Sequence, residues 1–437
     1  MATFHKIDKD SSNAITNALA LFDIPSTNVS ANASSFREYL TLNPLTDKPY
    51  HFKVHASTNY LDLSKCYLFS EFRIRKENAA GQLANLEAAD NVSVCQLIGH
   101  TFIKNCRVSI NGTQVFEGNS LMSYKSILDY ELTYPDSVKN SYLNAAGYYT
   151  DPESQTEGSG FDSRKQLFAR SKLAQFIAKL NVDLFNQPKY LVNQCEIDIE
   201  ILPNESNFII IAPDAGAPRY HFEVVTLKMY IKTIELVDSL AYDLNKKLEL
   251  KPARYPVRKT SIKSVFINAN HTEFNACLWT DQIPRRIVCC LVSNGAYRGS
   301  QNTSPFEFKP FNLREITITA NGATHPQAVY SLDFPNGKYV RSFYDMNEAI
   351  GYAGSLESNG ITMKKYANGW CFFVFNLTCS KEDNGDTFDL IKPGSCLIKL
   401  VFNEPVPAGG IDLICMGEVD SLLMLDRNRV ISTDVSI

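Results

Sequence analysis

Several features of membrane-bound, nucleic-acid-coating or secreted proteins are missing from this sequence. No run approaches the roughly 18 uninterrupted apolar residues that a membrane-spanning helix needs. The 43 basic and 47 acidic residues give a net charge of −4, which argues against a protein that coats nucleic acid by charge. The first ten residues, MATFHKIDKD, contain no apolar stretch of a secretory signal. We therefore expect a soluble, globular, intracellular protein without sequence-specific nucleic-acid binding.

Motifs for catalysis or metal binding are also missing. The sequence contains no GxxxxGK[ST] phosphate loop, HExxH pair, CxxC pair or GxSxG elbow. Its only GxG, Gly158-Ser159-Gly160, follows a polar loop rather than a strand, and the seven histidines are scattered. Asp198 and Glu200 alternate with isoleucines, which indicates the solvated face of a strand. We predict no catalytic, cofactor-binding or metal-binding residues, and hence no cofactor and no enzymatic activity.

The eleven cysteines favour a reducing compartment. Their number is odd, and most lie inside apolar runs such as Ile287–Val292. Buried reduced thiols that pack as small apolar side chains explain this distribution better than a disulfide framework.

Most of the chain after residue 49 shows the two-residue period of β-strands. In Glu196–Ile201, isoleucines alternate with carboxylates, which predicts a strand with one buried face. Asn-Gly pairs at 111–112 and 321–322 follow two such runs and predict tight type I′ hairpins. Similar alternation occurs in Leu68–Ile74, Cys106–Ile110, Thr226–Lys232, Glu315–Thr319 and Leu397–Phe402.

Three segments carry a helical period: Leu121–Leu132, Leu240–Leu250 and Arg341–Tyr352. The second lies near the middle of the chain and is followed by Pro252 and Pro256, so it is a natural connector between two halves. Each half presents an Asn-Gly hairpin, a helix and an alternating strand in the same order. Corresponding features are offset by roughly 200–220 positions, which favours two tandem copies of one β-sandwich.

Residues 1–49 differ from the rest. A short helical pattern (Ile15, Ala18, Leu19 and Phe22) precedes the Ser/Asn/Ala-rich run Ser26–Ser35. Such a run cannot bury a core, so we expect a flexible or clamping arm.

Two further features bear on partners. The basic cluster Lys246–Lys263 could contact nucleic acid or an acidic neighbouring subunit, although a solvated linker leading into a strand is favoured. The chain has 26 Phe and 21 Tyr, many of them in expected loops; loop aromatics often anchor interfaces, although some simply close the ends of a sandwich. Together with the missing catalytic motifs, they favour a protein that assembles. The loop aromatics include Tyr148, Tyr149, Phe306, Phe308 and Phe311.

Phe161–Phe208 resembles a segment of the major capsid proteins of Polinton (Maverick) elements and adintovirus-like DNA viruses. Its matching features are the residues Arg164, Phe168, Arg170 and Ser171, the turn Asp183–Gln187, and the long strand after Tyr190-Leu191. Order and spacing make the likeness specific over nearly the whole chain after about residue 45. Further matches are Tyr60–Ser64, Gly147, Asp151, Ile283–Arg286, Ser304–Phe308, Ile316–Ile318, Gly322 and the closing run Gly394–Asp426.

The resemblance implies an all-β double jelly roll of two tandem eight-stranded sandwiches with a few short helices. It implies a homotrimer that forms a pseudo-hexagonal capsomer and tiles an icosahedral shell around a double-stranded DNA genome. Penton and minor capsid proteins would be its partners, and the protein would be made in the host's reducing cytoplasm or nucleus. The implied regions are an N-terminal arm (1–49), a first roll (50–237), a connector helix (238–249) and a second roll (250–437).

Two alternatives stay open. A jelly-roll spike or a carbohydrate- or receptor-binding protein would have the same strand pattern. A glycosidase on a tandem sandwich would need two convergent carboxylates about 5–10 Å apart. In the capsid interpretation, aromatic loops and strand edges make the contacts, and the arm Ala2–Tyr39 becomes ordered only on a neighbour or on the inner lattice.

Overall fold

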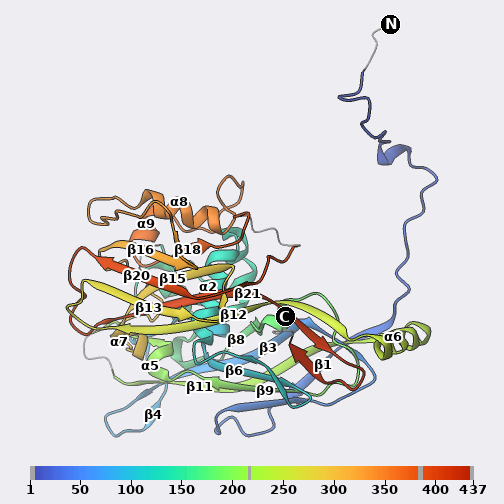
Figure 1. Cartoon of the computed structure of the whole chain (residues 1–437). Helices are drawn as coiled ribbons and strands as arrows, with labels where there is room; N and C mark the ends of the chain where they lie inside the picture. Colours follow the sequence, from blue (N-terminus) through green and yellow to red (C-terminus); the bar gives the residue numbers. More distant parts are fainter. Residues whose placement is uncertain (1–4, 153, 215–217, 382–386, 434–437) are drawn as a thin grey trace.

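The structure, a computed structural model, describes residues 5–152, 154–214, 218–381 and 387–433. Antiparallel β-sheets dominate it and form two sandwiches, one from each half of the chain (Figure 1). Residues 1–4 of the predicted arm and 434–437 of the predicted second roll lie outside the described residues.

Within the described residues, the first sandwich is built from two layers of four main strands each, and the short strand β4 (Leu83–Ala84) adds to the edge of one layer. One layer has the order β1-β11-β3-β8 and the other β2-β9-β6-β7. Numbered one to eight along the chain, these strands pair as 1-8-3-6 and 2-7-4-5. They are β1 (Ala31–Leu40), β2 (Tyr50–Val54), β3 (Tyr60–Glu77), β6 (Ile103–Ile110), β7 (Thr113–Glu117), β8 (Ala174–Lys179), β9 (Ile197–Pro203) and β11 (Tyr220–Leu236).

The second sandwich repeats this pairing. Its layers have the orders β12-β21-β15-β18 and β13-β20-β16-β17, which again give 1-8-3-6 and 2-7-4-5. The tandem duplication predicted from the feature offsets is therefore confirmed. The strands are β12 (Ala253–Ile267), β13 (Glu273–Trp279), β15 (Arg286–Ser293), β16 (Leu313–Ala320), β17 (Ala323–His325), β18 (Phe373–Asn376), β20 (Cys396–Phe402) and β21 (Ile411–Leu425).

Short elements fill the connections. The small strands are β4 (Leu83–Ala84), β5 (Ser93–Val94), β10 (Ile210–Ile211), β14 (Gln282–Ile283), β19 (Lys392–Pro393) and β22 (Ile431–Thr433). The α-helices are α1 (Ile98–Thr101), α2 (Met122–Thr133), α3 (Asp136–Lys139), α4 (Ser159–Leu167), α5 (Ser206–Ile209), α6 (Asp238–Leu250), α7 (Asn294–Arg298), α8 (Val340–Ala349) and α9 (Met363–Ala367). The 3-10 turns are η1 (Asn17–Leu19), η2 (Tyr142–Ala146), η3 (Ala169–Ser171) and η4 (Asp183–Asn186).

The predicted strands and hairpins are present. Burial alternates strictly along β9, whose isoleucines face the core. Both Asn-Gly pairs close hairpins, β6–β7 and β16–β17. Asn111 and Gly112 have φ values of 49° and 77°, and Asn321 and Gly322 have 46° and 82°, which is the left-handed geometry that a type I′ turn requires.

The three predicted helices are also present, as α2, α6 and α8. The N-terminal helical pattern, by contrast, forms only the single turn η1, and its residue Phe22 is 93% exposed. A short helix is marginal in water without a surface that covers its apolar side. The pattern therefore indicates a helix that lacks a partner within its own chain.

The predicted arm contributes a strand to the first sandwich. β1 pairs with β11 from Ala31↔Leu236 to Leu40↔Lys228, while nearly all its side chains stay exposed. The expectation that the whole arm orders only on a neighbour is therefore wrong for residues 31–40. An edge strand is held by backbone pairing and does not need apolar side chains, so the Ser/Asn/Ala-rich composition showed no strand pattern.

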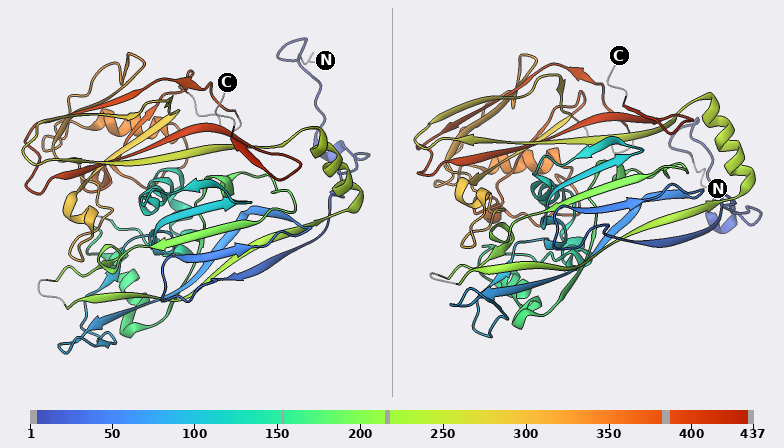
Figure 2. Two further views of the ribbon diagram at one scale, coloured as in Figure 1. Left: turned by 60° about the horizontal axis from the view of Figure 1, so that its bottom comes forward. Right: turned by 90° about the horizontal axis from the view of Figure 1, so that it is seen from below.

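Helix α6 links the last strand of the first sandwich to the first strand of the second (Figure 2). Among the described residues, every sheet takes its strands from one side of α6 only. The proposed division at residues 50, 238 and 250 stays a prediction.

The two cores join into one continuous cluster of buried apolar side chains. Nine of the eleven cysteines are buried, as expected for small apolar side chains, whereas Cys277 and Cys379 are exposed. The described residues contain no helix that is both long enough and apolar enough to span a bilayer.

Two neighbouring positions of β9 test the burial pattern. Ile199 is 1% exposed, so Ile199→Ala should lower the free energy of unfolding by about 2–5 kcal/mol. Asp198→Ala on the opposite face should change it by less than about 0.5 kcal/mol. Urea titration followed by circular dichroism measures both, and equal losses would show that the two faces are assigned wrongly.

Candidate functional site

The contact between the two sandwiches is built around aromatic rings. Tyr124 of α2 lies 5.4 Å from Phe306 and 5.8 Å from Tyr297 of α7, measured between ring centroids. Phe208 of α5 lies 5.7 Å from Phe306. Edge-to-face packing of this kind adds about 0.5–1.5 kcal/mol per pair beyond burial alone. Helix α2 therefore joins the two halves through rings from both.

This arrangement corrects the prediction that loop aromatics anchor contacts between subunits. Phe306 and Phe308 are each 1% exposed and Tyr148 is 4% exposed, so they pack inside the chain; Tyr149 and Phe311 are half-buried. The sequence pattern identified interface residues but could not tell an interface within a chain from one between chains. Large aromatics that do reach the surface of the folded body include Phe36, Tyr142, Tyr190, Tyr242 and Tyr344.

A fully buried ion pair lies beside this contact. Arg164 of α4 and Asp151 are both 0% exposed, and the guanidinium is 3.0 Å from the carboxylate. Arg164 Nε also donates to the Val94 carbonyl at 3.0 Å. Burial raises the pKa of the Asp151 carboxyl, and Arg164 counteracts part of that shift. The pair is saturated with partners, which is the form in which buried charge is tolerated.

The GxG segment serves this ion pair rather than a nucleotide. A Cβ atom on Gly160 would lie 2.2 Å from Asp151 Oδ1. The absence of a side chain at Gly160 therefore lets α4 begin directly against the carboxylate.

Buried lysines tie the first sandwich to the second. Lys139 Nζ donates to Glu131 Oε2 at 2.9 Å and to the carbonyl of Asn359, in the second half, at 2.8 Å. Lys125 Nζ lies 3.2 Å from Asp183 Oδ1, whose other oxygen accepts from the Thr260 amide of β12 at 2.7 Å.

Burial opposes the charge of Lys125, but its two carboxylate neighbours, Asp129 and Asp183, outweigh that effect and raise its pKa. Of these charged groups, Lys139 and Asp183 each form a hydrogen bond with the second half of the chain.

Two buried carboxylates line one cavity, the arrangement that a glycosidase would require. Glu131 and Asp151 share a cavity of only about 10 Å³ between the halves, which is about the space of one water molecule. Lys139 and Arg164 neutralise them. No sugar fits there.

The other candidate polar groups are paired or dispersed. Lys53 lies 3.6 Å from Asp198, and Arg107 lies 3.5 Å from Glu200, so the polar face of β9 carries ion pairs. Across the described parts of the chain, no group of three or more His, Cys, Asp or Glu side chains is placed to hold a metal ion.

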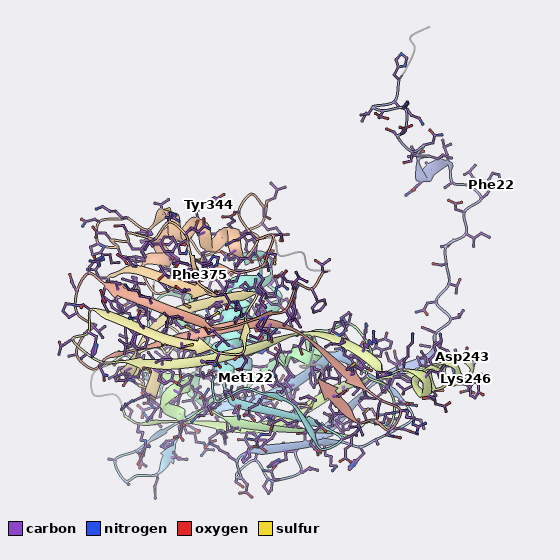
Figure 3. All side chains as sticks on the ribbon, viewed as in Figure 1. Phe22, Met122, Asp243, Lys246, Tyr344 and Phe375 are labelled. Atoms are coloured by element: carbon purple, nitrogen blue, oxygen red, sulfur yellow. The ribbon has the colours of Figure 1, made fainter. Side chains whose placement is uncertain are left out.

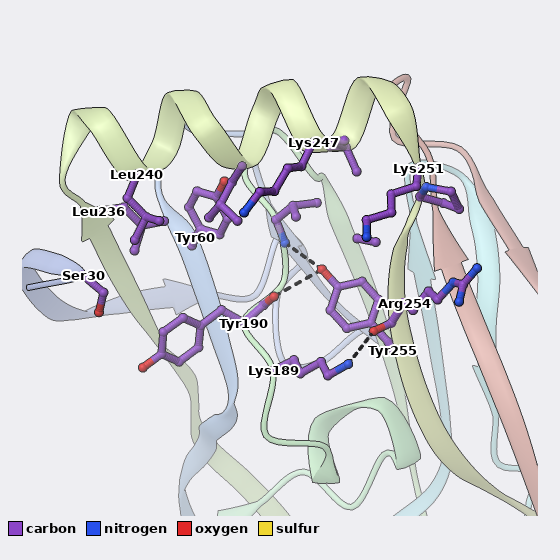
Figure 4. Close-up of a pocket in the computed structure, with 15 residues that line it drawn as sticks. Ser30, Tyr60, Lys189, Tyr190, Leu236, Leu240, Lys247, Lys251, Arg254 and Tyr255 are labelled. Atoms are coloured by element: carbon purple, nitrogen blue, oxygen red, sulfur yellow. Dashed lines mark hydrogen bonds between the residues drawn. The ribbon is translucent and has the colours of Figure 1, made fainter. Parts of the chain in front are cut away.

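An apolar groove of about 420 Å³ lies beneath α6 (Figure 4). Leu240, Leu244 and Leu248 of α6 form one wall, and Tyr60 and Tyr255 lie opposite. Tyr255 is held by its hydroxyl, which donates to the Tyr190 carbonyl at 3.2 Å and accepts from the Val192 amide at 3.1 Å. The remaining lining residues are Ser30, Lys189, Leu236, Lys247, Lys251, Pro252, Ala253 and Arg254.

The basic cluster Lys246–Lys263 partly lines this groove. Lys247, Lys251 and Arg254 belong to its lining. The cluster runs through the last turn of α6 into β12, which begins at Ala253. Six of its seven basic side chains are exposed and the segment leads into β12, as the favoured interpretation expected, although only two residues separate the helix from the strand.

Large apolar side chains are exposed along the N-terminal segment. Phe22 stands well away from the folded body (Figure 3). In this segment the exposed large apolar residues are Ile7, Ile15, Leu19, Leu21, Phe22, Ile24 and Val29, each at least 67% exposed. A row of this length without cover indicates a missing partner surface.

Comparison with known proteins places the chain beside one sequence relative and several viral structures. No family model matches it. An uncharacterized protein of Caenorhabditis elegans, F54H12.2, is 30% identical over 398 residues, covering 89% of this chain and 94% of the nematode protein.

Solved structures of similar fold are viral capsid proteins. The capsid protein of the Sputnik virophage matches with a TM-score of 0.66 and 12% identity, over 99% of this chain and 95% of its own. The mavirus major capsid protein matches with a TM-score of 0.56 and 11% identity, over 99% of this chain and 96% of its own. The PBCV-1 capsid protein matches with a TM-score of 0.59 and 11% identity, over 95% of this chain and 100% of its own. These proteins are double jelly rolls, so the predicted fold class is confirmed.

The buried ion pair predicts a strong asymmetry between single and double substitutions. Arg164→Met should lower the free energy of unfolding by about 3–5 kcal/mol, because it leaves Asp151 buried without its partner. Adding Asp151→Leu should restore part of that loss. Gln166→Met, at an exposed position of the same helix, is the control. Urea unfolding measures all three, and a harmless Arg164→Met would contradict the assignment.

Because His100 of α1 is buried, we expect the free energy of unfolding to decrease as the pH is lowered. This side chain is 3% exposed with its ring 4.5 Å from that of Tyr130, and burial, with a smaller effect of Lys125, lowers its pKa from 6.5 to about 3. Between these values only the unfolded chain binds the proton, so stability falls as pH falls, by up to about 1.4 kcal/mol per pH unit.

His100→Phe should remove this contribution, and His51→Phe, at an exposed position, should not. Urea midpoints at pH 7, 6 and 5 measure the slope; an unchanged slope in His100→Phe would refute the assignment.

Proposed function

The chain belongs to the same family as the nematode protein, and we propose that it is the major structural protein of an icosahedral capsid around a double-stranded DNA genome. One observation carries the proposal. Both sandwiches have the strand order 1-8-3-6 and 2-7-4-5, and this tandem architecture matches viral capsid proteins over nearly the full length of both chains.

The geometry fits a building block of pseudo-sixfold shape. Two sandwiches of equal topology, fixed to each other by the aromatic and ionic contact around α2, present two similar outer faces. Three copies around a threefold axis would then supply six sandwiches and close a pseudo-hexagonal capsomer. In this proposal the rolls span 50–237 and 250–437, residues 238–249 connect them, and β1 of the arm supplies the first of the eight strands of the first roll.

The finer assignment is to capsids of Polinton (Maverick) elements or adintovirus-like viruses. It is supported by the residue likeness in Phe161–Phe208 and by a 30% identical relative in an animal, since an element integrated in host DNA would leave its capsid gene in an animal genome. Penton and minor capsid proteins would complete the shell, and the virion would be its place of action.

We propose no catalytic role. The buried carboxylates are neutralised, and their shared cavity has the volume of one water molecule. With a net charge of −4, the shell would not neutralise its genome, so DNA would enter through a separate packaging machine.

The mass of the purified chain in solution tests the proposal. Light scattering after size exclusion should give a species near three times 49.0 kDa, and negative-stain images should show hexagonal outlines. A monomer that persists at micromolar concentration would contradict the capsid role. If that monomer bound a glycan array, a carbohydrate- or receptor-binding jelly roll would replace it.

A further inference from the structure

Within the described residues, two apolar surfaces are left uncovered, and their shapes are complementary: one is a groove and the other a helical stripe. One is the groove beneath α6, whose wall residues Leu240 and Leu244 are only half-buried. The other is the helical pattern of the N-terminal segment, with Ile15 and Leu19 exposed by 73% and 67%. An apolar groove and an apolar helical stripe are the two halves of a common peptide-recognition mode.

The stripe has the spacing of a groove-binding helix. Ile15, Ala18, Leu19 and Phe22 occupy positions i, i+3, i+4 and i+7, which share one face of an α-helix. Pro25 follows, and the residue before a proline disfavours helical geometry, so the helix would end by Asp23. In the free chain only the turn Asn17–Leu19 forms, because nothing covers the stripe.

We propose that residues 15–23 of one copy bind as a helix in the groove beneath α6 of a second copy. Ile15, Leu19 and Phe22 would pack against Leu240 and Leu244. The inference rests on the proposed self-assembly and names the contact through which one copy holds the next.

The course of the chain favours a second copy over the chain's own groove. Ser30 lines the groove, and its carbonyl accepts a hydrogen bond from the Val237 amide at 3.2 Å. From this point the segment leads away from the folded body on the α6 side (Figure 1). To enter its own groove it would have to reverse within the five residues 25–29, whereas no reversal is needed for it to reach the groove of a second copy placed along its course.

Charge supports the same pairing. Asp23 is the only charged residue between Ser11 and Ser35, and it stands at the C-terminal end of the proposed helix, beside the apolar stripe. The groove lining carries Lys189, Lys247, Lys251 and Arg254. An acidic residue at the edge of the stripe can therefore meet a basic rim, which would fix the direction of the helix in the groove.

Site-directed crosslinking between two full-length chains tests the inference. Both chains carry Cys277→Ser and Cys379→Ser to remove the exposed thiols. One carries Thr16→Cys beside the stripe, and the other, with a tag that changes its mass, carries Tyr190→Cys at the groove. After mixing and treatment with a short bismaleimide, a denaturing gel should show a crosslinked pair of unequal chains.

Variants of the stripe and of the groove test whether the crosslink depends on this contact. Leu19→Ser with Phe22→Ser, or Leu244→Lys in the groove, should reduce the crosslinked product by about tenfold, as expected for anchor residues. The controls are Ile24→Ser, an exposed apolar residue just beyond the end of the proposed helix, and Tyr242→Lys, an exposed residue of α6 outside the groove lining. Both should leave the yield unchanged.

Other results separate the inference from the proposed function. Assembly to the trimer mass without any crosslink between copies would overturn the inference alone. A chain carrying both cysteines that links only within itself would show that the groove takes its own arm, and equal losses in the control variants would show that the contact is nonspecific. A persistent monomer would overturn the capsid proposal as well.

Discussion

The packing of the two sandwiches against each other constrains the rest of this molecule. Charged groups such as Lys125, Lys139 and Arg164 are buried there, and a buried charge is tolerated only when every partner is in place. Those partners come from both halves: Asn359 completes Lys139, and Thr260 completes the Asp183 that faces Lys125. An orientation of the halves that differed by a few ångströms would break the hydrogen bonds that Asn359 and Thr260 form with Lys139 and Asp183.

Rigidity of that kind matters for a repeated building block. When copies are arranged around an axis, small errors in the angle between the two sandwiches of each copy accumulate. Weak contacts between copies cannot hold that angle fixed if the subunit itself is flexible. The strong contacts therefore lie within the chain, where they are made once during folding. In the proposed capsid, the exposed elements, namely the edge strand β1, the N-terminal segment and the groove beneath α6, would serve reversible association.

Local structure could be read from the sequence to a large extent. The alternation in β9, the two Asn-Gly hairpins and the helices α2, α6 and α8 follow from the period of apolar residues and from turn chemistry. The duplication followed because those signals recur in the same order. Strand β1 was missed, since an edge strand whose side chains face solvent leaves no apolar period.

The position of Phe306 inside the chain and the contact of the basic cluster with the groove were missed for a different reason. Both depend on which distant segments meet, and neither composition nor spacing records that. The groove beneath α6 was partly predictable, because the period of Leu240, Leu244 and Leu248 indicates a helix with an apolar face.

The pairing of first with last strand sets the order in which the chain can fold. β1 at Ala31 pairs with β11 at Leu236, and β12 at Ala253 pairs with β21 at Leu425. In each sandwich the sheet that contains the first strand cannot be completed until the final strand, β11 or β21, has left the ribosome, and at roughly 5–20 residues per second this takes on the order of ten seconds or more per half. During that interval the long central strand β3 has unpaired edges, which in a crowded cell are sites for aggregation or for chaperone binding.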